Sequence, residues 1–234
     1  MKLLERDSNL NQLEQALQEA MAGQGHVILV SGEAGIGKTS LVDQFTQAHR
    51  ASARVLWGAC DSLFTPRPLG PLHDVALQVD GELSALLRSD ANQLAIFSAC
   101  FVELQQSHSI VVFEDIHWAD EATLDLIKFL GRRIQRTASL LILTYRDDEL
   151  DPAHPLRLIL GDLPRGFTNR IQLTPLSKAS VLELARAANQ TAQAEELFEA
   201  TGGNPFFVTE VLASEGRARW RWRRCEAFRC SAGD

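Results

Sequence analysis

The sequence predicts an α/β fold with a doubly wound parallel sheet. Short, almost wholly apolar stretches alternate with longer segments of helical periodicity, and strands that are covered on both faces have this continuous apolar character. A glycine-rich loop follows the first of these stretches directly, at residues 32–37. The 234 residues are enough for one large or two small domains.

Five strands are expected, each a short run between helical segments. They cover residues 26–31, 55–60, 110–113, 139–144 and 170–173. Helices are expected over about 8–22, 39–50, 72–107 and 121–136, and the pattern is wholly helical from 177 to 214. Prolines make 61–71 an irregular loop, and Asp120 is placed to cap the helix that follows it.

Composition excludes several classes of protein. Apolar residues make up 45% of the chain and charged residues 23%, which excludes a disordered chain, a collagen-like fibre and a coiled-coil rod. The formal net charge of −7 argues against nucleic-acid binding by the molecule as a whole.

The four cysteines have no zinc-site spacing and are expected to be free thiols. The N-terminus is too polar for a signal peptide, and no apolar run approaches the ~20 residues of a membrane helix, so we expect a cytoplasmic protein without membrane contact.

The stretch GEAGIGKT, Gly32 to Thr39, fits the phosphate-binding pattern G-x-x-x-x-G-K-[ST]. Small residues allow backbone N–H groups to approach phosphate oxygens, and the helix that begins near Lys38 adds its positive end. Lys38 is expected to reach the β- and γ-phosphates, and the Thr39 hydroxyl to bind Mg²⁺. The expected nucleotide-binding residues are Gly32, Glu33, Ala34, Gly35, Ile36, Gly37, Lys38, Thr39 and Ser40. The alternative is a strand-to-helix turn that binds nothing, but the flanking strand and helix favour a P-loop.

Two carboxylates, Glu114 and Asp115, follow the apolar run of 110–113 and so lie at the ligand-binding edge of the sheet. One can hold Mg²⁺, usually through water, while the other orients the attacking water. Glu114 stands where the metal-holding Asp is usual, and Asp115 stands where the catalytic acid is usual, so both assignments stay open. One of the pair could also be an ordinary loop carboxylate. His117 is either a packing or capping side chain or a group that polarises water, and Trp118 is expected to pack in the core.

The sequence Thr144-Tyr145-Arg146 ends the next strand, where Arg146 could contact the γ-phosphate and report its loss; the alternative is a solvated arginine that starts a loop. The resulting order of strands is typical of P-loop proteins in which a strand intervenes between the phosphate-loop strand and the acidic one. Further on, TGGNPFF (201–207) separates two helical segments. Its glycines end one helix and Pro205 begins the next. The turn is either punctuation or part of a helical lid over the adenine.

Together these motifs resemble the ATPase module of the STAND class of AAA-related ATPases, and most closely that of the large ATP-binding LuxR-type transcriptional regulators. The resemblance covers residues 3–214, and the matching stretches are SGEAGIGKTSLV, LWGACDSLFTPRPLGPLHDVA, VVFEDIHWADEATLDLIKFLGRRI, LLILTYRDDEL, HPLRLILGDLP and TGGNPFFVTEVLAS. It implies an ASCE/AAA-like P-loop NTPase domain over 1–175 and the start of a helical lid over 176–214. It also implies catalytic roles for Lys38, Glu114, Asp115 and Arg146, Mg²⁺ contacts by Thr39, Glu114 and Asp115, and a place near the base for Pro205.

The resemblance implies a switch that binds ATP or ADP with Mg²⁺. In such regulators ADP holds the inactive state, ATP favours a homo-oligomer, and slow hydrolysis resets the switch. Their sensor and DNA-binding domains have no counterpart in the sequence, so DNA contact is expected only through domains outside it. The family motif L-x-G-R-E is Leu3-Leu4-Glu5-Arg6-Asp7; glutamate in place of glycine is expected to weaken the wall near the adenine.

The last segment, 215–234, contains six arginines, two tryptophans and two cysteines. Three interpretations stay open: an arm for nucleic acid or an acidic membrane, a disordered terminus, and an out-of-frame extension. Two alternatives to the switch follow from other features of the chain. One is a P-loop phosphotransferase, and the other is a nucleic-acid-binding protein that acts through the basic tail.

Overall fold

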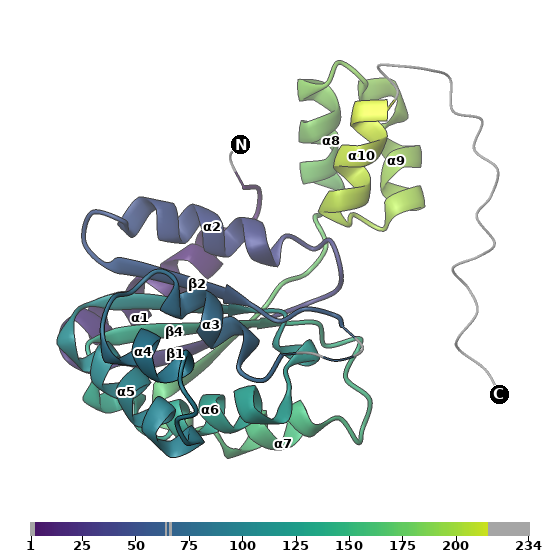
Figure 1. Ribbon diagram of the computed structural model, residues 1–234. Helices are drawn as coiled ribbons and strands as arrows, with labels where there is room; N and C mark the ends of the chain where they lie inside the picture. The colour runs from purple at the N-terminus through teal and green to yellow at the C-terminus, as the bar shows by residue number, and fades with distance from the viewer. Residues whose placement is uncertain (1–2, 64, 66, 215–234) are drawn as a thin grey trace. The chain divides into compact units, whose positions relative to one another are not determined.

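A computed structural model describes residues 3–63, 65 and 67–214 (Figure 1). The chain divides into two compact units, one that ends at Thr174 and one that begins at Pro175. The basic segment of 215–234, with Cys225 and Cys230, lies outside the described residues. Within the described residues, no helix has both the length and the apolar character needed to cross a bilayer.

The first unit is built on a five-stranded parallel sheet in the order β2-β3-β4-β1-β5. The strands are β1 (His26–Ser31), β2 (Arg54–Ala59), β3 (Ser109–Glu114), β4 (Ser139–Tyr145) and β5 (Thr168–Gln172). Each lies within two residues of its predicted bounds. The predicted α/β fold with a parallel sheet is therefore confirmed. β4 separates the phosphate-loop strand β1 from the acidic strand β3, as the order of motifs predicts.

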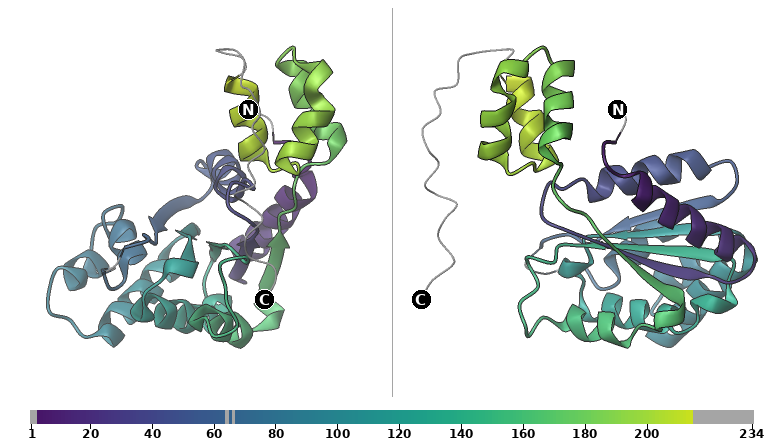
Figure 2. Two further views of the ribbon diagram at one scale, coloured as in Figure 1. Left: turned by 90° about the vertical axis from the view of Figure 1, so that its right-hand side faces the viewer. Right: turned by 180° about the vertical axis from the view of Figure 1, so that it is seen from behind.

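Helices cover both faces of this sheet (Figures 1 and 2). They are α1 (Asp7–Met21), α2 (Lys38–His49), α3 (Gly70–Ala76), α4 (Glu82–Leu87), α5 (Gln93–Gln106), α6 (Glu121–Gly131) and α7 (Pro155–Asp162). Because successive strand residues face opposite sides, Ile28 and Val30 join a core with α1 and α2. Val27 and Leu29 join a second core with α3 to α7. The central strands β1, β3 and β4 are thus buried on both faces, which explains their almost uninterrupted apolar sequences.

Three helical details differ from the sequence prediction. The expected helix of 121–136 ends at Gly131 and is followed by a 3₁₀ turn, Ile134–Arg136. The helical stretch of 72–107 is three helices: Gly81, with φ +125°, precedes α4, and Asn92 caps the start of α5. Helix α7 was not predicted. It begins at Pro155, and the His154 ring accepts a 3.2 Å hydrogen bond from the Leu156 N–H, which satisfies one donor of its first turn.

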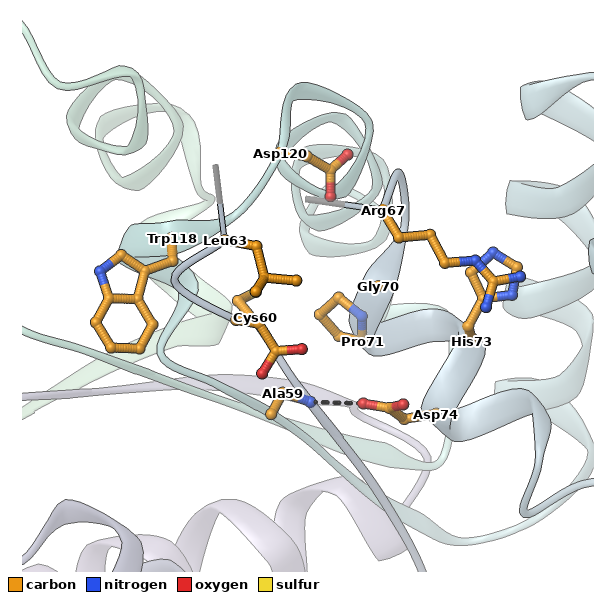
Figure 3. A pocket seen from close by; sticks show the side chains of 11 residues that line it. Ala59, Cys60, Leu63, Arg67, Gly70, Pro71, His73, Asp74, Trp118 and Asp120 are labelled. Carbon is orange, nitrogen blue, oxygen red and sulfur yellow. Dashed lines mark hydrogen bonds between the residues drawn. The ribbon is translucent and has the colours of Figure 1, made fainter. Parts of the chain in front are cut away.

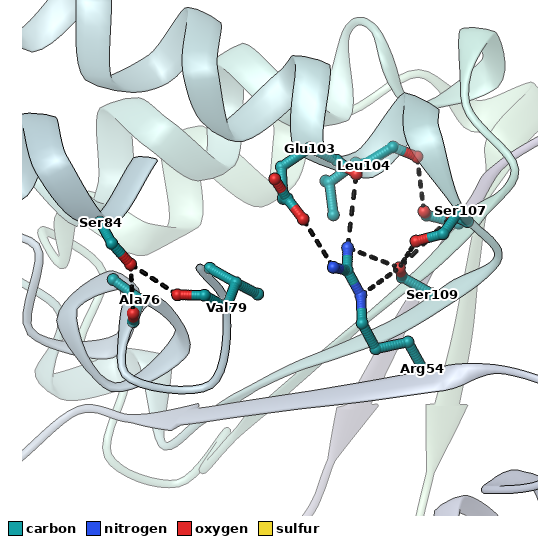
Figure 4. Close-up of polar contacts among 9 residues, drawn as sticks. Arg54, Ala76, Val79, Ser84, Glu103, Leu104, Ser107 and Ser109 are labelled. Atoms are coloured by element: carbon teal, nitrogen blue, oxygen red, sulfur yellow. Dashed lines mark hydrogen bonds and ion pairs between the residues drawn. The ribbon is translucent and has the colours of Figure 1, made fainter. Parts of the chain in front are cut away.

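Side-chain hydrogen bonds fix the segments at the amino ends of β2 and β3 (Figure 4). The Arg54 guanidinium donates to Glu103 Oε1 at 2.6 Å and to Ser109 Oγ at 3.3 Å, and so joins β2, α5 and β3. Figure 4 also shows the contacts of Ser84, on α4. Its Oγ atom lies 2.5 Å from Ala76 O and 2.7 Å from Val79 O, and so connects α4 to the end of α3. The opposite, carboxyl ends of the strands carry the loops that hold the polar residues singled out above.

The second unit is helical. Its elements are α8 (Lys178–Ala187), the 3₁₀ turn η4 (Thr191–Gln193), α9 (Ala194–Thr201) and α10 (Pro205–Ser214). Gly202 and Gly203 have φ of +58° and +77° between α9 and α10. A Cβ atom at Gly203 would lie 2.2 Å from Leu176 O, so only glycine fits there. The predicted turn, with Pro205 at the start of a helix, is confirmed.

Candidate functional site

The glycine-rich loop turns from β1 into α2 through three glycines with positive φ. Gly32, Gly35 and Gly37 have φ of +144°, +73° and +96°. A Cβ atom at Gly32 would lie 2.9 Å from Leu173 O, so a side chain there would displace the loop. Gly37 is the N-cap residue of α2, which places the positive end of that helix at the loop. The loop therefore has the backbone form of an anion-binding nest.

The Lys38 side chain lies inside this loop. Its Nζ atom donates hydrogen bonds to Gly32 O at 2.7 Å and Glu33 O at 3.0 Å. Burial lowers the pKa of the Lys38 ammonium from its usual value, and the nearby Asp115 carboxylate opposes this change. The ammonium is thus held among oxygens at the centre of the loop, where a phosphate group would bring further oxygen acceptors.

Arg6 fixes the loop from the other side. This buried guanidinium donates to Thr174 O at 2.8 Å and to Ile36 O at 3.4 Å. It therefore ties the phosphate loop to the segment that leaves β5. The preceding residue, Glu5, has φ +57°, a left-handed conformation that favours glycine. Glutamate thus stands at a glycine position of the motif, as the sequence indicates, whereas the contacts of Arg6 with Ile36 and Thr174 were not predicted.

Glu114, at the end of β3, is held by two donors from different elements. Thr39 Oγ1, in the first turn of α2, donates to Glu114 Oε1 at 2.6 Å. Trp57 Nε1, on β2, donates to Glu114 Oε2 at 2.9 Å. The structure thus brings together two of the predicted metal ligands, Thr39 and Glu114. It adds Trp57, for which the sequence analysis assigned no role.

Asp115 contacts different partners. Its backbone has φ 52° and ψ 43°, and its N–H donates to Thr144 Oγ1 on β4 at 3.0 Å. Its Oδ1 atom lies 3.9 Å from His117 Nδ1. The turn to left-handed backbone directly after β3 therefore separates the two neighbouring carboxylates, one toward Thr39 and the other toward His117.

Arg146 pairs with Glu149 and lies over Trp118. The guanidinium carbon is 4.9 Å from the Trp118 ring centroid, and Nη1 donates to Glu149 Oε1. Burial would raise the pKa of Glu149, but the hydrogen bond and charge of Arg146 hold it below its usual value. His117 Nε2 lies 3.3 Å from the other oxygen of Glu149. No role was predicted for Glu149, although it lies in the matching stretch LLILTYRDDEL, three residues after Arg146.

A cavity of about 220 Å³ lies beside the ends of β2 and β3 (Figure 3). Trp118 forms one side, and Arg67 and His73 stand opposite it. Cys60 lines the cavity, and burial, with the nearby Asp120 carboxylate, raises the pKa of its thiol to about 12. Cys60 and Cys100 are free, buried thiols, as predicted for these two. Asp120 caps α6 through Thr123 N at 3.1 Å, as predicted, and also accepts from Leu69 N.

The chemistry of the Thr39 and Glu114 oxygens suits Mg²⁺. This ion takes hard oxygen ligands and usually combines one or two protein groups with phosphates and water. In the part of the chain that the structure describes, no three His, Cys, Asp or Glu side chains gather as a metal site. A hydroxyl and a carboxylate beside a phosphate loop fit a metal that is also held by nucleotide phosphates. Pro205 lies in the second unit, at the start of α10.

The parallel sheet and the G-x-x-x-x-G-K-[ST] loop between β1 and α2 define a P-loop NTPase fold. More particularly, the family model described as "AAA ATPase domain" matches residues 2–143, and the chain belongs to this family. Membership implies nucleotide binding, typically with Mg²⁺.

The solved structures that share the fold include the following three. The Walker-type ATPase paby2304 of Pyrococcus abyssi is 16% identical with a TM-score of 0.61, over 92% of this chain and 68% of that one. The Orc1 protein of Aeropyrum pernix, solved in complex with DNA, is 14% identical with a TM-score of 0.59, over 95% and 63%. Cdc6p from Pyrobaculum aerophilum is 18% identical with a TM-score of 0.55, over 79% and 49%.

One curated relative also matches. It is an uncharacterized protein of Rhizobium meliloti (strain 1021), 27% identical over 262 residues. The match includes 89% of this chain but 24% of the relative. The chain thus spans about a quarter of the length of the curated relative that it matches.

Proposed function

We propose that the chain is a switch module that binds ATP or ADP with Mg²⁺ and hydrolyses ATP slowly. The observation that carries this proposal is the 2.6 Å contact between Thr39 Oγ1 and Glu114 Oε1 beside the phosphate loop. Two oxygen ligands from separate elements meet there, next to a buried lysine and a helix N-terminus. A glycine-rich turn without a ligand would not require the Thr39 hydroxyl and the Glu114 carboxylate to meet beside it.

The roles of the residues follow from their positions. Residues 32–40 hold the phosphates, with Lys38 at the β- and γ-phosphates. Thr39 and Glu114 form the metal side, while Asp115, whose carboxylate lies beside His117, acts on the attacking water. Mg²⁺, when bound, neutralises charge on the β- and γ-phosphates.

Slow turnover is consistent with the position of Arg146. Its guanidinium is already paired with Glu149, so contact with a γ-phosphate requires that this ion pair be exchanged. Such an exchange makes Arg146 a sensor of the triphosphate. The exchange of this ion pair also adds a step before hydrolysis, which is consistent with slow turnover.

The second unit, with the proposed lid of 176–214, completes the module. We propose that Pro205 and the turn before it lie near the base when nucleotide is bound. The wider context, a cytoplasmic LuxR-type regulator that forms homo-oligomers with ATP and contacts DNA through other domains, rests on the motif resemblance alone.

Calorimetric titration with ADP and ATP, each with Mg²⁺, tests the proposal. We expect micromolar or tighter binding that Lys38→Ala weakens at least tenfold, and phosphate release on the order of 0.01 s⁻¹ or slower. Lys128→Ala is the matched control, because Lys128 lies on α6 and pairs with Asp162 on α7. Equal affinities of wild type and Lys38→Ala would refute the proposal.

The cavity beside β2 favours one second candidate, a phosphotransferase. It lies at the ligand-binding edge of the sheet and is lined by Arg67 and Asp120, so an acceptor could enter there. Transfer of the γ-phosphate to a small acceptor, faster than its release to water, would favour this reading over the switch.

A further inference from the structure

We propose that Trp57 is a positioning residue that aims the Glu114 carboxylate at Thr39 and the nucleotide-bound Mg²⁺. The inference rests on the proposed nucleotide function and adds to it a residue on a different strand. It concerns the indole N–H, which donates to Glu114 Oε2 at 2.9 Å.

The two donors on Glu114 are arranged so that each oxygen has one task. An ionised carboxylate only accepts hydrogen bonds, and an indole N–H only donates. Trp57 occupies Oε2, while Oε1 lies 2.6 Å from Thr39 Oγ1. The oxygen that Trp57 leaves open is therefore the one beside the other predicted metal ligand.

The length of the Glu114 side chain explains why it needs a second anchor. Glutamate has one rotatable bond more than aspartate, the residue usual at this position, and loses more conformational freedom when it is fixed. A free glutamate at the end of β3 would sample several positions. The indole N–H restricts it to the position that faces Thr39.

Trp57 is itself held in place through its backbone. β2 is an edge strand, and the Gln78 amide pairs with its open side. Gln78 Oε1 accepts from Trp57 N at 3.0 Å, and Gln78 Nε2 donates to Trp57 O at 2.5 Å. Two residues along β2, Ala59 N donates to Asp74 Oδ2 at 3.1 Å (Figure 3). The strand that carries the indole is thus tied to α3 and the residues that follow it.

The contact is open to ions and to spectroscopy. Trp57, Glu114 and Thr39 line a hollow of about 690 Å³ on the α2 side of the sheet. The indole packs against the core of α1 and α2 while its N–H reaches the carboxylate. Its fluorescence should therefore change when Glu114 receives a cation.

The first experiment measures the affinity of ADP with excess Mg²⁺ and with EDTA, for wild type and Trp57→Phe. Phenylalanine retains an aromatic ring but lacks the N–H. We expect a decrease of about tenfold in the tightening that Mg²⁺ confers, since hydrogen bonds to charged groups are among the stronger ones, and little change in EDTA. Val55→Ala is the control, because Val55 packs on the same core from the same strand. It should leave the Mg²⁺ effect unchanged.

The second experiment is a double-mutant cycle with Glu114→Asp. Aspartate is too short to keep both contacts, so Trp57→Phe should have no further effect on the Mg²⁺ tightening in that background. A structural role of Trp57 alone would instead give additive losses. Titration of the ADP complex with Mg²⁺ should also change tryptophan emission in wild type and not in Trp57→Phe.

The outcomes separate this inference from the proposed function. One outcome is that wild type binds nucleotide through Lys38 and that Mg²⁺ raises the affinity for ADP equally in wild type and in Trp57→Phe. This outcome overturns the role of Trp57 and leaves the nucleotide site in place. If wild type binds no nucleotide, or does so independently of Lys38, both proposals are overturned.

Discussion

His117 Nε2 lies 3.3 Å from Glu149 Oε2, on the carboxylate whose other oxygen is paired with Arg146. Within the described residues, neither ring nitrogen of this buried histidine makes a contact with the geometry of a hydrogen bond, so the interaction with Glu149 is one of charge. Its Nδ1 atom faces Asp115 at 3.9 Å. A row of four side chains, Asp115, His117, Glu149 and Arg146, therefore connects the carboxylate proposed to act on water with the arginine proposed to sense phosphate.

Removal of the Glu149 charge should free Arg146 for phosphate. We expect Glu149→Gln to tighten ATP binding by about two- to fivefold, because a partly exposed ion pair contributes up to about 1 kcal/mol. ADP binding should stay unchanged, since ADP lacks the γ-phosphate. Calorimetry of both nucleotides tests this, with Asp162→Asn, which breaks the exposed pair with Lys128, as the control. Equal shifts for ATP and ADP would contradict the sensor role.

The stability of the first unit should depend on pH through His117. Burial lowers the pKa of this ring below its usual 6.5, although Asp115 and Glu149 oppose the change and Arg146 and Lys38 add to it. Below pH 6.5 the unfolded chain takes up a proton that the folded protein resists. The free energy of unfolding should therefore fall as the pH decreases from 6.5 toward the lowered pKa.

Thermal unfolding between pH 7.5 and 5 measures this effect. His117→Phe, which keeps a ring beside Trp118, should flatten the decrease of Tm on acidification. Burial also lowers the pKa of His73, so both proteins should carry His73→Gln for the comparison. Parallel pH profiles with and without His117 would show that another group is responsible.

The backbone of Glu5 should favour glycine. With φ +57°, a side chain at this position costs about 1 kcal/mol that glycine avoids. Glu5→Ala removes the carboxylate but keeps the Cβ atom, so it is the matched reference. In urea titrations, we expect the free energy of unfolding to be about 1 kcal/mol higher for Glu5→Gly than for Glu5→Ala. Equal stabilities would mean that the left-handed turn is not maintained in solution.

Two glycines should respond in opposite directions to alanine. A Cβ atom at Gly58 on β2 would lie 2.1 Å from Pro71 O. A Cβ atom at Gly161 on α7 would have no neighbouring atom within 4 Å. Gly58→Ala should reduce the free energy of unfolding by about 2 kcal/mol or more, since α3 must move. Gly161→Ala should raise it by about 0.5–1 kcal/mol through helix propensity. Urea titration measures both, and a stable Gly58→Ala variant would show that α3 is not packed this closely on β2.

Sequence alone determined the features that depend on local pattern. Short runs between helical segments predicted all five strands, and for β1, β3 and β4 burial on both faces shows directly in the composition. The glycine spacing of residues 32–37 likewise predicted the phosphate loop, since positive φ is read from glycine itself. Helix α7 was not predicted, because a helical pattern of eight residues is too short to be distinguished from the loops beside it.

Tertiary structure alone decided which side chains meet. The sequence left Glu114 and Asp115 interchangeable, and only the left-handed turn at Asp115 directs one toward Thr39 and the other toward His117. Trp57, Glu149 and Arg6 all lie within the matching motifs, but the motifs do not show which atoms these side chains contact, because their partners lie on other elements or on the far side of a turn. Contacts such as Trp57 with Glu114, 57 positions apart in the chain, arise from the order of strands in the sheet, and no local periodicity records that order.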